Sequence, residues 1–278
     1  MSFTAGRAVV AGMLALVFLL LTINTAIVQA EPTFPAIHIV RKVENIALRK
    51  TIQELYAFCV QLKGGKGVAA APDWAKMGFG EHEEYFYKQN YALYERWTNY
   101  EVDIAGNCAI KKSKMHKAEI DNGRYKYELD LVERSGIKLP SQVKIQQMLH
   151  RQFKQVNEQM PGIDQALLHG LKETGLVREK RPGEELEAIK RATIAGQPCE
   201  YIPMLDGKAG EYCVWSKMPE YPAEVEREIV LKSDFGADGD WMQREKATKF
   251  EVRDKFDDLK MFEPPAGIKL EDRSQLPY

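Results

Sequence analysis

The sequence predicts an α+β fold built from antiparallel strands and several helices. In residues 42–62 apolar side chains recur at alternating steps of four and three, which is the spacing of one helical face. From about Asn99 onward apolar and polar side chains alternate, which is typical of strands. Of the 278 residues, 45% are hydrophobic and 28% are charged, so the chain can bury a core of its own.

The net charge of the chain is close to zero. There are 39 Lys and Arg against 40 Asp and Glu, which gives a formal charge of -1. Proteins that bind nucleic acid or an anionic membrane surface usually carry an excess of basic residues. The composition therefore indicates neither partner, and we expect no binding to nucleic acid.

The first thirty residues have the pattern of an export signal. After Arg7, the stretch Ala8 to Leu21 is apolar and uncharged, and it is shorter than the about 20 residues that a spanning helix requires. Val28 and Ala30 suit the -3 and -1 positions of a cleavage site. Residues 1–30 are thus expected to be a signal peptide, or else an uncleaved anchor formed by residues 8–28. Both interpretations place residues 31–278 outside the cytoplasm, in the periplasm or another exported compartment.

Residues 31–98 are expected to form an N-terminal helical segment. Its first helix, 42–62, has an apolar face formed by Leu48, Ile52, Leu55, Cys59 and Leu62. Gly64–Gly67 ends this helix, and it predicts a linker because it lacks the Lys-Ser/Thr ending of a phosphate-binding loop.

A second helix is expected over residues 81–100. At helical spacing, one face carries four aromatic residues: Tyr87, Tyr91, Tyr94 and Trp97. Such a stripe either packs on the core or forms the lip of an apolar pocket, since Tyr and Trp can face a ligand and keep a polar edge in water. These four residues are the candidate ligand-binding set.

Residues 99–278 are expected to form an antiparallel β domain. Asp121-Asn122-Gly123 favours the positive φ angles of a tight turn and predicts a hairpin over 114–134. Further strands are expected on either side of Asp206-Gly207 and of the stretch 236–240. A helical insertion occupies 141–190, with a break at Pro161-Gly162 and a second helix from Ile163 to Thr174.

The four cysteines suggest two disulfides in an exported chain. Cys199 and Cys213 are each seven residues from Asp206, so a hairpin that turns there brings them opposite one another. Cys59 then pairs with Cys108 by elimination, although three connectivities are formally open and buried free thiols are the alternative.

No catalytic or cofactor motif is present in the sequence. His82-Glu83-Glu84 fails the HExxH zinc pattern because position 86 is Phe. We therefore expect no metal, no cofactor and no enzymatic activity. The enzymatic alternative requires that folding bring His38, His82 and His116 together with carboxylates.

Three segments resemble the C-terminal part of exported β-rich domains of the LolA/LppX-like class. They are Thr193 to Tyr201, the strand Cys213-Val214-Trp215, and the closing Phe262 to Leu270. The resemblance implies a curved antiparallel sheet or half-barrel with helices packed on its concave side. It also implies carriage of lipid or lipoprotein acyl chains across the cell envelope. The insertion 141–190 departs from that pattern, and the resemblance assigns no ligand-contacting residue.

Two functions are compatible with these observations. The first is an exported, non-catalytic cell-envelope protein that binds a hydrophobic ligand or acyl chain between sheet and helices. The alternative is a structural or interaction protein of an envelope assembly, which has a filled core and binds a protein partner.

Overall fold

A computed structural model describes residues 35–159, 189–204, 209–217, 228–237 and 240–275. Residues from Phe34 to Tyr278 form one compact unit. The predicted signal segment, the helix at 163–174 and the turn at Asp206 lie outside the described residues.

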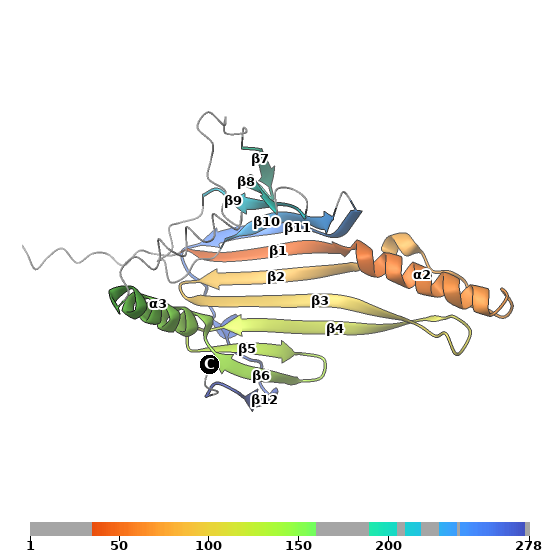
Figure 1. Ribbon diagram of the computed structural model, residues 1–278, viewed down its shortest axis with the longest axis horizontal. Coiled ribbons are helices and arrows are strands. Elements are labelled where there is room, and N and C mark those ends of the chain that lie inside the picture. Colours follow the sequence, from red (N-terminus) through yellow and green to blue (C-terminus); the bar gives the residue numbers. More distant parts are fainter. Residues whose placement is uncertain (1–34, 160–188, 205–208, 218–227, 238–239, 276–278) are drawn as a thin grey trace, which may run out of the picture. The chain divides into compact units, whose positions relative to one another are not determined.

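The described residues form one sheet of twelve strands (Figure 1). The strands are β1 (Ala36–Asn45), β2 (Phe79–Tyr87), β3 (Asn90–Val102), β4 (Ile110–Asp121), β5 (Tyr125–Asp130), β6 (Ser135–Pro140), β7 (Arg191–Ile194), β8 (Gln197–Met204), β9 (Gly210–Trp215), β10 (Val230–Ala237), β11 (Asp240–Arg253) and β12 (Lys269–Asp272). The helices are α2 (Ile46–Leu62) and α3 (Gln142–Gln159), with short 3-10 turns η1 (Trp74–Lys76) and η3 (Lys260–Phe262).

Two meanders meet in the middle of this sheet. The spatial order is β12-β6-β5-β4-β3-β2-β1-β11-β10-β9-β8-β7. Every neighbouring pair is antiparallel except β12 and β6, which are parallel. Strand β1 pairs with β2 on one side and with β11 on the other, so it joins the N-terminal meander to the C-terminal one.

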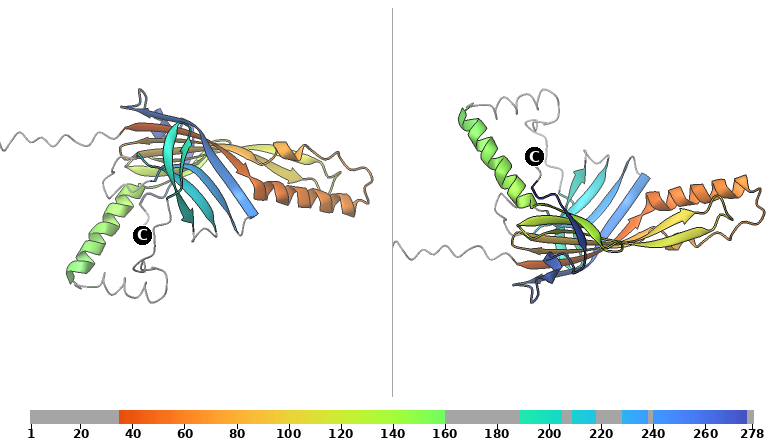
Figure 2. Two further views of the ribbon diagram at one scale, coloured as in Figure 1. Left: turned by 90° about the horizontal axis from the view of Figure 1, so that it is seen from above. Right: turned by 90° about the horizontal axis from the view of Figure 1, so that it is seen from below.

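The predicted α+β class, with helices packed on the concave side of the sheet, is wrong. The described residues are almost all β, with only two α-helices beside twelve strands. Helix α2 packs at the ends of β3 and β11, and Figure 2 shows α3 pointing away from the sheet. The sheet is therefore not built around a helical layer.

Most of this error comes from residues 81–100, which form strands and not a helix. They belong to the hairpin β2–β3, in which Phe86 pairs with Tyr91 and Glu84 with Leu93. A run dense in aromatic residues satisfies a period of 3.6 and a period of 2 equally well. Tyr, Phe and Trp favour strands, and the pairing with β1 and β4 decides the outcome.

The first predicted helix is confirmed from Ile46 onward. Asn45 caps α2 by accepting a hydrogen bond from the Leu48 amide at 2.8 Å. The helix ends before Gly64, whose φ of 57° is readily adopted by glycine. Residues 42–45 instead finish β1, because Ile37, Ile39 and Val43 alternate with polar residues.

The C-terminal hairpins are confirmed with one difference. The stretch before Asp206-Gly207 was expected to form one strand, but it turns at Ala195-Gly196 and gives both β7 and β8. Both turn residues have positive φ. Strand β6 was not predicted, since Ser-Gly-Ile-Lys-Leu-Pro has no clear alternation of apolar and polar residues.

Of the predicted insertion 141–190, residues 141–159 and 189–190 are described, and α3 forms most of the first stretch. Ser141 donates to Asp121 Oδ1 at 2.8 Å, and the Gln142 amide donates to Asp121 Oδ2 at the same distance. Asp121 and Ser141 are buried, so these bonds fix the first turn of α3 at the end of β4.

The sheet curls over one of its own faces. Strand β7 contacts β11, although three strands lie between them and a flat sheet would place them about 19 Å apart. The resulting core joins Ile37 and Phe86 to Ile194 and Trp215. The opposite face of β3–β5 is covered by the C-terminal segment, which buries Phe256 and Phe262.

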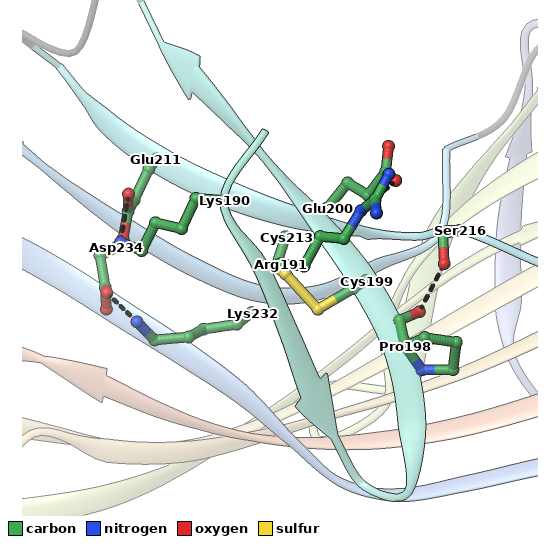
Figure 3. Close-up of a disulfide and its surroundings, with 10 residues drawn as sticks. All are labelled: Lys190, Arg191, Pro198, Cys199, Glu200, Glu211, Cys213, Ser216, Lys232 and Asp234. Carbon is green, nitrogen blue, oxygen red and sulfur yellow. Dashed lines mark hydrogen bonds and ion pairs between the residues drawn. A yellow bond between two sulfur atoms is a disulfide. The ribbon is translucent and has the colours of Figure 1, made fainter. Parts of the chain in front are cut away.

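Both predicted disulfides are present. Cys199 and Cys213 join β8 to β9 with a Cα–Cα distance of 5.4 Å (Figure 3). They are diagonal neighbours, because Cys213 pairs in register with Tyr201 and Cys199 with Trp215. Cys59 of α2 joins Cys108, which precedes β4.

Two disulfides in one chain indicate an oxidising, exported environment, since cytosolic thiols are kept reduced. Neither of the two described helices is long and apolar enough to cross a bilayer.

Candidate functional site

The curled face of the sheet contains a hollow of about 680 Å³. Strands from both meanders and the first turns of α3 line it. The apolar part of the lining consists of Phe86, Tyr91, Val143, Met204, Tyr212, Val230 and Phe235, and the polar part of Arg41, Glu84, Glu119, Gln142, Gln146, Glu228, Ser233 and Glu245. The hollow thus offers apolar surface beside a charged patch.

Arg41 and Glu84 form a buried ion pair in this lining. Arg41 Nη1 lies 2.5 Å from Glu84 Oε1, and Nη2 lies 2.8 Å from Oε2, which is a bidentate arrangement. Arg41 Nε also donates to the Val230 carbonyl at 2.8 Å, so the side chain links β1 to β10. Burial alone would lower the pKa of Arg41, but the Glu84 carboxylate more than compensates and raises it.

His82 lies next to this pair, between two carboxylates. Its Nε2 is 3.2 Å from Glu95 Oε1 and its Nδ1 is 3.5 Å from Glu245 Oε2. The first contact is an ion-pair distance without an aligned hydrogen bond. Burial by itself would lower the pKa of His82, but Glu245 and Glu95 raise it to about 9. The imidazole is therefore protonated at neutral pH and is a cation, not a general base.

The pKa values of the carboxylates around His82 are shifted in the opposite direction, downward. Burial would raise the pKa of Glu245, yet the hydrogen bond with His82 and the charge of Arg41 lower it. The contact with His82 lowers the pKa of Glu95 as well. Two cations and three carboxylates thus form one charged network at the hollow, with a formal net charge of -1.

The four aromatic residues predicted as a ligand-binding set do not share a face. Tyr91 lines the hollow. Trp97 points to the same side of the sheet but packs edge-on against His82, with ring centroids 5.5 Å apart. A Cβ at Gly80 would lie 2.5 Å from the Trp97 ring, so glycine leaves the space that this ring fills.

Tyr87 and Tyr94 point to the other side of the sheet. Both belong to the core formed with the C-terminal segment, where Tyr87 lies against the ring of Phe256. The Tyr94 hydroxyl donates to the Met261 carbonyl at 2.9 Å. Since side chains alternate along a strand, a set chosen at helical spacing divides between the two faces.

The three histidines of the enzymatic alternative also lie apart. His82 is on the face of the hollow, whereas the strand register puts His38 and His116 on the opposite face. There His38 lies 3.0 Å from Glu83 and 3.2 Å from Glu251, and its ring stacks on Tyr85. Folding therefore does not assemble one site from these histidines.

No sequence motif marks Arg41, Glu84 and Glu245 as residues of this site. A signal was available in β1, where Ile37, Ile39 and Val43 occupy alternate positions and Arg41 falls in the same series. A charged residue at an inward strand position requires a buried partner, and Glu84 is that partner.

A second hollow of about 780 Å³ continues along the same face, over β3–β6 and β12. It shares Glu119 with the first, and its lining includes Lys117, Glu128, Asp130 and Lys269. Because this lining is strongly charged, the first hollow offers the better surface for an apolar group.

Comparison with known proteins gives no match, either among protein-family models or among curated sequences.

Proposed function

We propose that this chain is an exported, non-catalytic cell-envelope protein, acting in the periplasm or a similar compartment, that holds a hydrophobic ligand or an acyl chain in the hollow around Tyr91. The observation that carries the proposal is the hollow itself, whose volume of about 680 Å³ lies within the range of known ligand pockets. Carriage of acyl chains is also what the LolA/LppX-like resemblance of residues 193–270 implies.

The lining fits a molecule with one apolar and one polar part. Phe86, Tyr91 and Val230 offer apolar surface, and each methylene buried there contributes about 0.8 kcal/mol. The Arg41–Glu84 pair and Glu245 offer charged hydrogen-bonding groups to a polar end. The ligand class that we propose is therefore an amphiphile and not a pure hydrocarbon.

A cavity-filling variant tests this function. Ser233 lines the hollow, and Ser233→Trp places an indole in it. We expect the wild-type protein to bind a fluorescent fatty-acyl probe and to retain amphiphile in native mass spectrometry. We expect the variant to bind the probe at least about tenfold more weakly, because the indole occupies the space in which the acyl chain would bury its apolar surface.

The control is Thr193→Trp at an exposed position of β7, which should bind the probe as the wild type does. Circular dichroism checks that both variants fold. If the folded wild type binds no probe and carries no amphiphile, the ligand-binding proposal is wrong and the protein acts through its surface. Equal binding by all three proteins would show that the probe does not bind in this hollow.

A further inference from the structure

Helix α2 exposes an apolar flank beside its buried face. Leu55, Phe58 and Leu62 follow one another at steps of three and four, so they share one side of the helix. Phe58 is 52% exposed and Leu62 is 60% exposed. The neighbouring buried face holds Ile52 and Cys59, which already pack on the sheet. The sheet thus covers only part of the apolar surface of α2, and the rest is exposed.

The loop before β4 adds to this apolar surface. Lys63 Nζ donates to the Ala105 carbonyl at 3.2 Å, and Cys59 Sγ lies 3.9 Å from the Ile104 carbonyl oxygen. The loop therefore lies against the C-terminal half of α2, where the Cys59–Cys108 disulfide holds it. Ile104 is itself exposed.

Positive charge is concentrated in the same part of the molecule. We define the α2 region as residues 46–78 and 98–114, which form α2, the segment after it, and the adjoining ends of β3 and β4. It contains eight Lys or Arg against four Asp or Glu, whereas the whole chain has a charge of -1. Lys66, Lys112 and Lys114 are exposed and make no ion pair with the described residues. A balanced total charge conceals this segregation.

We propose that the α2 region docks on a lipid bilayer that carries anionic headgroups. An exposed apolar flank together with exposed lysines in the same region is the kind of surface that interfacial helices present to membranes. Phe58 and Leu62 would enter the headgroup boundary, and the lysines would contact lipid phosphates. A nucleic acid would use the basic residues but gain nothing from the apolar flank. The proposal does not depend on the hollow, which lies on a different part of the sheet.

Vesicle flotation tests the docking. We use the compact unit from Phe34 to Tyr278, which contains every described strand and both disulfides, so that the apolar stretch Ala8 to Leu21 cannot itself enter the vesicles. The vesicles are phosphatidylcholine with or without phosphatidylglycerol. We expect binding only when phosphatidylglycerol is present, and we expect salt to weaken it.

Two variants separate the apolar from the charged contribution. Phe58→Gln with Leu62→Gln makes the two most exposed residues of the flank polar and keeps residues that suit a helix. Lys66→Glu with Lys112→Glu and Lys114→Glu reverses the charge. Each variant is expected to bind the anionic vesicles at least about tenfold more weakly.

Matched controls change the same residue types elsewhere. The apolar control is Val132→Gln with Leu149→Gln, and the charge control is Lys246→Glu with Lys255→Glu and Lys269→Glu, all at exposed positions. Both should bind as the wild type does. Absence of vesicle binding, equal binding to neutral vesicles, or equal loss in the controls would each overturn the proposal. A photo-crosslinker at position 58 that captures one envelope protein, with no lipid binding, would instead assign the region to a protein partner.

Discussion

Single residues in the sheet make the face of the hollow charged where a β-protein core is usually apolar. Arg41, His82, Glu84 and Glu245 come from β1, β2 and β11, and their pairing depends on all three strands being in register. Buried ion pairs contribute less to stability than their Coulomb attraction suggests, but the loss of one partner is severe. Replacement of any one of these residues is therefore expected to destabilise the fold, because it leaves a buried charge without its partner.

The raised pKa of His82 predicts a pH dependence of stability. The pKa of about 9 in the folded state lies above the ordinary value of 6.5, so protonated His82 stabilises the fold. This contribution is fully present below about pH 6.5 and is lost as the pH rises through about 9. His82→Gln should therefore be less stable than the wild type near pH 6, and the difference should shrink near about pH 10.

Urea unfolding of both proteins across this pH range measures the effect. The control is His116→Gln, because burial and then the charge of Arg96 lower the pKa of His116. Its difference from the wild type should stay constant above about pH 7. A difference for His82→Gln that is independent of pH would contradict the prediction, because it would show that folding leaves the pKa of His82 unchanged.

Among the elements, those specified by residues adjacent in sequence could be predicted, and those that depend on contacts with distant residues could not. Asp121-Asn122-Gly123 specifies its turn within three residues, and the hairpin β4–β5 is confirmed. The caps and glycines around α2 are equally local. The aromatic run of β2 and β3 fits both periods, and only pairing with distant strands decides it. Arg41 was missed for the same reason, since Glu84 is 43 residues away.

The two disulfides should differ in their effect on stability. The Cys59–Cys108 bond spans 49 residues and the Cys199–Cys213 bond spans 14. In the chain-entropy model the longer loop contributes about 4 kcal/mol and the shorter about 3 kcal/mol. Cys59→Ser with Cys108→Ser should therefore lower the free energy of unfolding by more than Cys199→Ser with Cys213→Ser.

Urea unfolding ranks the two double variants, and hydrogen exchange locates the change. Loss of Cys59–Cys108 should speed amide exchange in α2, because Ile52 and Cys59 pack on a small core that this bond closes. The other double variant is the control and should leave exchange in α2 unchanged. The opposite ranking would mean that the Cys199–Cys213 bond stabilises the protein through effects other than the entropy of the unfolded chain.

At the scale of the whole molecule, β1 is the strand on which the sheet depends. It lies between the two meanders, and Ile37, Ile39 and Val43 are fully buried. Ile39→Ala should cost about 2–5 kcal/mol and should weaken both meanders together. Unfolding followed by tryptophan fluorescence and by far-ultraviolet circular dichroism should therefore give one coincident transition.

Val252→Ala is the control, since this side chain on the neighbouring strand β11 is 46% exposed. Its effect should stay within about 0.5 kcal/mol. Two separate transitions in the Ile39→Ala protein would contradict the central role of β1 and would show that each meander folds alone.

The pairing of β1 with β11 joins residues 36–45 to residues 243–253. A nascent chain emerges with its amino end first. The edge of β1 that pairs with β11 therefore has no partner until nearly the whole protein has been synthesised. Until then the backbone groups along that edge of β1 are available to any other extended segment. A fragment that stops before Asp240 keeps that edge open permanently, so its failure to accumulate in cells would be a matter of aggregation and proteolysis and not of a missing site.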